Sequence, residues 1–105
     1  MRIFKDYKGR NVRLTDERVT HFTKRLIKAG LMDKIEETIA NPDFVFESRT
    51  DPMAAIYYRY YRRVTAGDKY LCIVVKHERN DSYILTAYPS DHIKKGNLIW
   101  ERNKK

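Results

Sequence analysis

Apolar residues recur along this chain at two different spacings, and the change between them falls at Pro42. Ahead of the first helical pattern, residues 3–7 and 10–14 are short extended segments separated by Lys8-Gly9. Two extended segments joined by a glycine-containing turn are typical of a β-hairpin. The sequence therefore predicts a hairpin before the first helix.

Two helices are predicted between this hairpin and Pro42. Thr15 is suited to cap the first helix at its N-terminus, and Gly30 is suited to end it. The second helix is predicted over residues 32–40, because the proline that follows disfavours helical backbone before it. The apolar positions that recur at helical spacing are Val19, Phe22, Leu26 and Ile27 in the first helix and Met32, Ile35 and Ile39 in the second.

After Pro42 the chain is rich in Val, Ile, Tyr and Phe, in segments separated by short turns. Short connections imply antiparallel neighbours. Helices followed by strands predict an α+β fold, with two N-terminal helices packed on one face of a four- to five-stranded antiparallel sheet and the other face free. No linker or repeat interrupts the chain, so residues 1–105 are expected to form a single domain. The predicted strands are residues 43–48, 55–65, 69–77 and 82–88, with a last short strand within 92–101.

Cations outnumber acids in this chain, since 22 Lys and Arg residues against 14 Asp and Glu give a formal net charge of +8. Such an excess on a small body attracts polyanions, so RNA is the expected partner. The alternative is that the positive charge only keeps the protein soluble. No apolar run approaches the roughly 20 residues of a membrane helix, and residues 1–6 do not resemble a secretory signal, so a cytoplasmic protein without membrane contact is expected. The single cysteine, Cys72, lies in an apolar run and is expected to be buried.

Tyrosine and arginine are interleaved over residues 56–63. Because side chains alternate along a strand, positions 57, 59, 61 and 63 share one face and positions 56, 58, 60 and 62 share the other. Rings that stack on bases, together with guanidinium groups that pair with phosphates, suit a surface that binds nucleic acid. The alternative is that one of the two faces lies in the core. The nucleic-acid-binding residues predicted on this strand are Tyr57, Arg59, Tyr61 and Arg63.

Few residues of this chain match the patterns of metal or cofactor sites. His21, His77 and His92 are scattered, and no paired cysteines or glycine-rich phosphate loop are present, so neither a metal site nor a cofactor is expected. His21 lies on the polar side of the first predicted helix. Histidine is the side chain best suited to moving protons near neutral pH, although a lone surface histidine is often incidental.

The order of short motifs along the chain resembles the phage-encoded branch of the barnase–EndoU–colicin–RelE nuclease superfamily. The motifs are LTDERVTH (residues 14–21), ETIANPD (37–43), VFES (45–48), YLCIVVK (70–76), ILTAY (84–88) and IKKGNLIW (93–100). The resemblance implies a compact RelE/barnase-like fold and RNA cleavage without a metal. The catalytic candidates that it implies are His21, Lys76, Thr86 and Tyr88, with Arg18, Ser48 and Arg49 as secondary candidates.

The expected function is thus a metal-independent, endoribonuclease-like hydrolase of toxin type or phage origin. RNA supplies its own nucleophile, the 2′-hydroxyl, so the protein needs only to move protons and stabilise negative charge. No acidic general base is evident near His21. Two alternatives remain on the same fold, a non-catalytic nucleic-acid-binding module and a module that binds an acidic antitoxin or immunity protein.

Overall fold

The computed structural model describes residues 1–22, 30–65 and 68–102, and it describes only the backbone of residues 62–65 and 68. The strands in this part of the chain form one sheet in the order β1-β2-β6-β5-β4-β3-β7. Neighbouring strands are antiparallel except β2 and β6, which run parallel with Arg13 opposite Tyr83. The strands are β1 (Arg2–Lys5), β2 (Asn11–Leu14), β3 (Phe44–Glu47), β4 (Ala54–Thr65), β5 (Asp68–Glu78), β6 (Asp81–Ser90) and β7 (Leu98–Glu101).

The predicted fold class is wrong, because the described chain is mostly sheet and its helices are short. The meander β3–β6 was predicted to within one or two residues at each end, but the sheet extends beyond it on both sides. The predicted N-terminal hairpin joins it through β2, and β7 adds to it beside β3. Both additions pair segments far apart in the chain, which local periodicity does not report.

The first helix, α1 (Asp16–Val19), is much shorter than predicted. Thr15 caps it as expected, since its hydroxyl accepts a hydrogen bond from the backbone N–H of Arg18 at 3.2 Å. Thr20 is already the C-cap, and α1 contains no buried residue. The rest of the predicted first helix falls on residues 23–29, which lie outside the described part of the chain.

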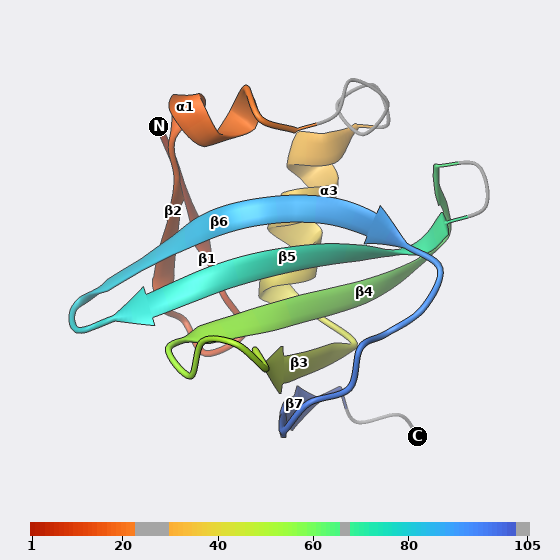
Figure 1. Cartoon of the computed structure of the whole chain (residues 1–105). Helices are drawn as coiled ribbons and strands as arrows, with labels where there is room; N and C mark the ends of the chain where they lie inside the picture. Colours follow the sequence, from red (N-terminus) through yellow and green to blue (C-terminus); the bar gives the residue numbers. More distant parts are fainter. Residues whose placement is uncertain (23–29, 66–67, 103–105) are drawn as a thin grey trace.

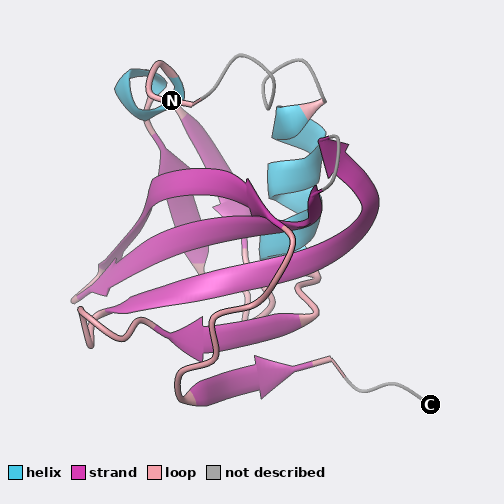
Figure 2. Cartoon of the chain, turned by 45° about the vertical axis from the view of Figure 1, so that its right-hand side comes forward, coloured by secondary structure: helices cyan, strands magenta, loops and turns pink. Residues whose placement is uncertain are grey.

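The second helix, α3 (Leu31–Ala40), provides the helical layer of the core. Gly30, predicted to end the first helix, is instead the N-cap of α3, with a left-handed φ of 75° that glycine adopts without strain. Ile35 and Ile39 are fully buried, as their spacing predicted. The helix packs against β1, β4 and β5, so the curved sheet folds around it (Figures 1 and 2).

The central strands separate two apolar clusters. On the α3 side, Tyr57, Leu71, Ile73 and Val75 have almost no exposed surface. On the other side Phe46, Tyr58 and Cys72 are buried, so the prediction for the cysteine is confirmed. No helix in the described residues is long and apolar enough to cross a membrane.

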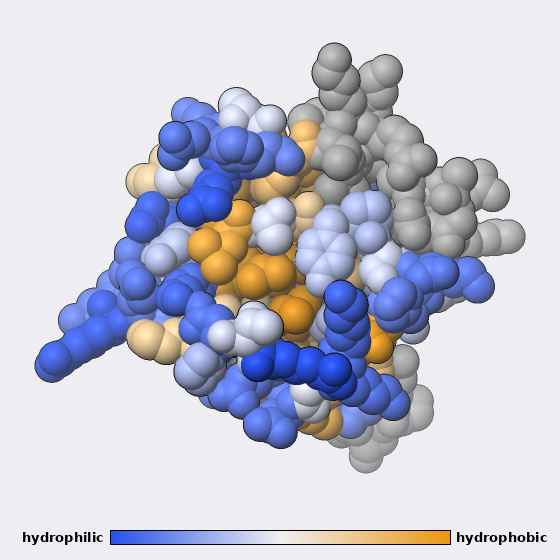
Figure 3. Space-filling view, viewed as in Figure 1, coloured by the Kyte–Doolittle hydropathy of each residue, from blue (hydrophilic) through white to orange (hydrophobic). Residues whose placement is uncertain are grey.

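We call the side of β4, β5 and β6 that is turned away from α3 the open face. In Figure 3, this face has apolar side chains near its centre and hydrophilic side chains around them. Part of it is covered by the segment between β6 and β7, where Ile93 packs against the cluster of Phe46, Tyr58 and Cys72. The open face includes the side chains of Ile56, Tyr58 and Tyr60 of β4, Tyr70, Cys72, Val74 and Lys76 of β5, and Thr86 and Tyr88 of β6.

Candidate functional site

The tyrosine–arginine strand turns its predicted nucleic-acid-binding side toward α3. Tyr57 has no exposed surface. The Tyr61 hydroxyl donates to a carboxylate oxygen of Glu37 at 2.7 Å, and Arg59 donates to the carbonyl of Asn41 at 2.6 Å. Tyr61 and Arg59 therefore hold α3 to β4, while Tyr57 is buried in the core between them and the N-terminal hairpin.

The last member of that set, Arg63, lies in β4, but its side chain is outside the described part. The alternate side of the strand, with Tyr58 and Tyr60, faces away from the helix. The alternation of faces was therefore predicted from the sequence, but the face chosen for nucleic acid is the one that packs on the core.

Three of the four catalytic candidates lie on the open face. Thr86 is opposite Val74 in the β5–β6 ladder, and Tyr88 is opposite Cys72. Lys76 lies two residues beyond Val74 on the same face of β5. The two adjacent strands therefore present an ammonium group and two hydroxyl groups to the same side.

Tyr88 is half-buried, and burial raises the pKa of its phenol to about 12. The phenol therefore keeps its proton near neutral pH and is a hydrogen-bond donor, whose present partner is the hydroxyl of Tyr58. Thr86 is exposed and offers a second hydroxyl donor beside it.

Lys76 is held by a carboxylate that the sequence did not single out. Its Nζ makes an ion pair and hydrogen bond with Asp51, and Asp51 is fixed in turn by accepting the backbone N–H of Met53 at 3.0 Å. The hydrogen bond raises the pKa of Lys76 and lowers the pKa of Asp51, so both groups remain charged. This carboxylate comes from the turn that precedes β4, and no hydrogen bond or ion pair joins it to His21 within the described residues.

Arg18 connects α1 to the open face. Its guanidinium donates to the backbone carbonyl of Leu85 at 3.4 Å, next to Thr86. His21 follows in the turn after α1, is exposed, and donates its backbone N–H to the carbonyl of Arg18 at 3.1 Å. Within the described residues the His21 imidazole makes no hydrogen bond or ion pair. The structure therefore brings Arg18 to the candidate strand, while nothing in the described residues joins the imidazole of His21 to Lys76.

Arg49 lies at the opposite border of the open face. Its Nε and Nη2 donate to the carbonyl of Lys95 at 3.0 and 2.6 Å, which ties the turn after β3 to the segment that leads into β7. The Ser48 hydroxyl lies 3.3 Å from the hydroxyl of Thr50. The secondary candidates Ser48 and Arg49 thus lie at one border of the face, and Arg18 lies at the other.

A second polar cluster lies on the opposite side of β5. Tyr57 donates its hydroxyl proton to the buried carboxylate of Asp6 at 2.8 Å. The Nε2 of His77 lies 3.1 Å from the same hydroxyl, so this nitrogen carries the hydrogen of the neutral ring, and Nδ1 accepts from Ser82 at 2.8 Å. Arg10 donates to both Asp6 and Tyr57, at 2.9 and 3.3 Å.

Electrostatics keep this cluster in one protonation state near neutral pH. Burial, aided by the positive charge of Arg10, lowers the pKa of His77. Burial and the Asp6 carboxylate raise the pKa of Tyr57 well above its usual range. His77 is therefore neutral and Tyr57 protonated.

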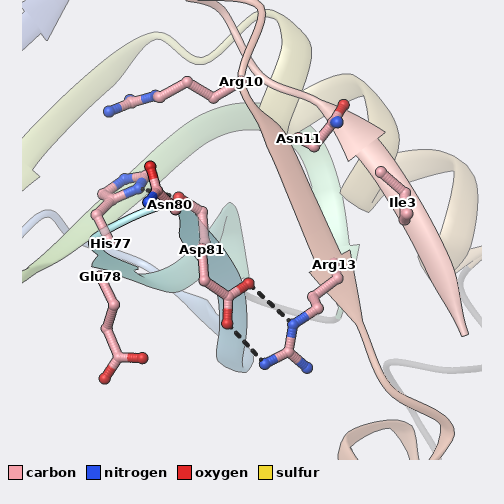
Figure 4. Close-up of a pocket in the computed structure, with 9 residues that line it drawn as sticks. Ile3, Arg10, Asn11, Arg13, His77, Glu78, Asn80 and Asp81 are labelled. Carbon is pink, nitrogen blue, oxygen red and sulfur yellow. Dashed lines mark hydrogen bonds and ion pairs between the residues drawn. The ribbon is translucent and has the colours of Figure 1, made fainter.

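The cluster borders a pocket of about 460 Å³ between the N-terminal hairpin and the β5–β6 turn. Figure 4 shows Arg10 extending toward His77, and Arg13 paired with Asp81 by two hydrogen bonds of 3.1 and 3.0 Å. The two arginines of this pocket are therefore already paired, Arg13 with Asp81 and Arg10 with Asp6. Because His77 follows Lys76 and points to the other face of β5, the pocket is separate from the open face.

Metal-ligating residues do not converge in the described part of the chain, where no group of three His, Cys, Asp or Glu side chains is close enough to hold an ion. The hydroxyl and cationic groups of the open face are instead of the kind that binds a phosphate directly.

Comparison with known proteins gives a single assignment. No curated protein and no solved structure matches the chain. A family model described as "phage-Barnase-EndoU-ColicinE5/D-RelE like nuclease2" matches residues 1–103, almost the whole length. The chain therefore belongs to this family of phage nuclease-like proteins.

Proposed function

We propose that the protein is an endoribonuclease that cleaves single-stranded RNA on the open face without a metal ion. The observation that carries the proposal is the gathering of Lys76, Thr86 and Tyr88 on one face of β5 and β6, beside the helix that bears Arg18. Membership of a nuclease-like family makes a nucleic acid the expected substrate. The excess of cations, +8 for the whole chain, favours binding of a polyanion.

The chemistry follows from RNA itself. The 2′-oxygen attacks the adjacent phosphorus, the bond from phosphorus to the 5′-oxygen of the next nucleotide breaks, and a 2′,3′-cyclic phosphate forms. One proton leaves the 2′-hydroxyl and one reaches the departing 5′-oxygen. A base, an acid and a fixed field of positive charge are therefore sufficient.

The residues of the open face can be matched to these roles. Lys76 and Arg18 supply positive charge for the phosphate oxygens, and Thr86 and Tyr88 donate hydrogen bonds to them. His21, exposed at the end of α1, is the proton-transferring group. For this role its imidazole has to reach the phosphate when substrate binds.

The test is cleavage of a 5′-labelled single-stranded RNA in excess EDTA. The wild-type protein should produce fragments ending in a 2′,3′-cyclic phosphate, and an RNA with a 2′-deoxy residue at the cleaved position should remain intact there. Loss of a general acid or base predicts a fall of about 100- to 10,000-fold for His21→Ala. Loss of a charge-stabilising group predicts a fall of about 100- to 1,000-fold for Lys76→Ala.

A matched control is Lys5→Ala, which removes one exposed lysine from β1 and should leave cleavage unchanged. All variants must keep the circular dichroism spectrum of the wild type. Cleavage that survives both His21→Ala and Lys76→Ala would refute the assignment of these residues. Cleavage of the 2′-deoxy substrate would refute the mechanism.

The second candidate is a nucleic-acid-binding module that uses the same face without cleavage. The ion pair between Lys76 and Asp51 favours it, because a lysine already paired with a carboxylate stabilises the negative charge that develops during cleavage less strongly than an unpaired lysine. This candidate predicts affinity that falls by about 0.7 log units per log unit of salt for each phosphate contacted on a single strand, with no product.

A further inference from the structure

We infer that the open face continues, beyond the candidate catalytic residues, into a pocket that holds one unpaired nucleotide, its base on Tyr60 and Tyr70 and its phosphate at Arg102. The inference rests on the proposed function, since the ligand is the same RNA strand. Beyond the proposed cleavage, it assigns the recognition of an unpaired base to this pocket.

The aromatic part of this pocket is a cross-strand pair. Tyr60 and Tyr70 are directly opposite in the β4–β5 ladder, and their ring centroids are 5.7 Å apart with an interplanar angle of 75°. Tyr70 packs against the buried cluster of the open face, which fixes its position. Tyr60 is 51% exposed, which leaves ring surface available to a stacked base.

The pocket has the size and the charge for a nucleotide. Its volume is about 370 Å³, within the range of roughly 300–1,000 Å³ that is usual for small-ligand sites. Arg102 pairs with Asp43 through one nitrogen, and its side chain is still 38% exposed. A guanidinium has five N–H donors, so Arg102 retains donors for a phosphate. The pocket is lined by Asp43, Phe44, Arg59, Tyr60, Tyr70 and Arg102.

The geometry of the pocket is fixed before any ligand binds. Asp43 is 4% exposed and accepts the backbone N–H of Tyr60 at 2.6 Å while it pairs with Arg102. The backbone N–H of Arg102 donates to the carbonyl of Asp43 at 3.0 Å. One buried carboxylate therefore fixes the backbone of the aromatic residue and one nitrogen of the cation, which reduces the entropy that binding must remove.

The pocket lies on the same face of β5 as the candidate catalytic residues, with the cluster that Ile93 partly covers between them. Tyr70, Cys72 and Val74 follow one another on the same face of β5, and Thr86 is opposite Val74. Tyr70 and Val74 are four positions apart along β5, which corresponds to about 13 Å at 3.3 Å per residue. A phosphate at Thr86 and a base at Tyr70 would thus belong to nearby nucleotides of one strand.

The chemistry selects single-stranded over double-stranded nucleic acid. A base can lie on Tyr60 only if it is not already paired and stacked in a helix. Stacking on an aromatic side chain tolerates any base, because every base has a π-face. The pocket should therefore favour unpaired nucleotides without strong preference among them.

Binding can be tested without cleavage by using a 2′-O-methyl RNA, which lacks the attacking hydroxyl. The affinity of a short fluorescent oligonucleotide is measured by anisotropy for the wild type, Tyr60→Leu and Tyr60→Phe. Stacking is worth about 1–3 kcal/mol per base, so Tyr60→Leu should weaken binding by about 5- to 150-fold. Tyr60→Phe keeps the ring and should bind within about twofold of the wild type.

A second pair of ligands separates stacking from charge. Removing a single base from the oligonucleotide at the bound position should weaken binding to the wild type as much as Tyr60→Leu does. It should cause no further loss in Tyr60→Leu, because the two changes remove the same contact. Polyphosphate, which has charge but no bases, should bind the wild type and Tyr60→Leu equally.

Equal affinity of the wild type and Tyr60→Leu for the oligonucleotide would overturn the inference, as would a matching loss of polyphosphate binding. Because the probe cannot be cleaved, these outcomes are independent of catalysis. If Tyr60→Leu loses binding but the wild-type protein cleaves no RNA, the pocket stands and the proposed nuclease activity fails. If RNA is cleaved but Tyr60→Leu binds normally, the nuclease activity stands and the pocket fails.

Discussion

Replacing Tyr57 by phenylalanine removes one buried oxygen atom that three partners share. The hydroxyl donates to Asp6 at 2.8 Å and accepts from His77 and Arg10 at 3.1 and 3.3 Å. Phenylalanine fills nearly the same volume, so no cavity forms and the change in stability reports the hydrogen bonds alone. Tyr57→Phe is therefore a sharp test of this polar cluster.

The expected loss follows from what each partner retains. Asp6 still accepts the backbone N–H groups of Lys8 and Arg10 and the Nε of Arg10, so its carboxylate remains satisfied. The Nε2–H of His77 loses its acceptor in a half-buried position. A hydrogen bond to a charged group contributes about 1.5–3 kcal/mol, and with the unpaired imidazole the total should be about 2–3 kcal/mol. For a chain of this size that corresponds to a fall in Tm of roughly 10–20 °C.

Urea unfolding measures this loss through the single tryptophan. Trp100 stacks on Tyr7 with ring centroids 4.9 Å apart, so its fluorescence should change when the hairpin leaves the sheet. Circular dichroism provides a second probe of the same transition. Tyr60→Phe makes the same chemical change on an exposed ring and should alter the free energy of unfolding by less than about 0.5 kcal/mol. If Tyr57→Phe costs no more than this control, the cluster does not stabilise the fold and our account of it is wrong.

Two further predictions concern protonation and charge. Burial lowers the pKa of His77 in the folded protein below the unfolded value of 6.5, so the unfolded chain binds a proton more readily. The stability that neutral His77 contributes is therefore present above pH 6.5 and is lost as the pH falls toward the folded pKa. His77→Gln should reduce the difference in urea midpoint between about pH 7 and pH 5.5, and an unchanged difference would assign the acid sensitivity to other groups. If Lys76 contacts a phosphate, Lys76→Ala should reduce the slope of log affinity against log salt by about 0.7 for uncleavable RNA, whereas Lys5→Ala should not change it. An unaltered slope for Lys76→Ala would show that Asp51 keeps this lysine from the nucleic acid.

Much of the central sheet could be predicted because its signals are local. Alternating Val, Ile and Tyr residues located β3–β6, and the sorting of residues 56–63 into two faces is borne out by Tyr57 and Tyr58, whose rings lie in clusters on opposite sides. The choice between the faces depended on where α3 packs, and both faces carry tyrosines. Local periodicity was therefore insufficient to decide it.

The parts that were missed depend on contacts between distant segments. Asp51 lies between the predicted strands 43–48 and 55–65 and was not singled out, because its pairing with Lys76 joins residues 25 positions apart. His77 was grouped with scattered histidines, since neither Asp6 nor Tyr57 is near it in sequence. His77 lies two residues after Val75 and therefore on the core-facing side of the strand. A polar residue at such a position needs a hydrogen-bond partner inside the protein, and this signal could have indicated the cluster.

The parallel pairing of β2 with β6 has a consequence for how the chain reaches its native state. Arg13 and Asp81, which bond across this seam, are 68 residues apart, so β2 has no lasting neighbour on that side until nearly all later strands exist. Closing so long a loop costs conformational entropy before any contact compensates for it, which slows folding. The first hairpin can therefore complete its pairing with the sheet only after β6 has formed, although it precedes every other described element in the chain.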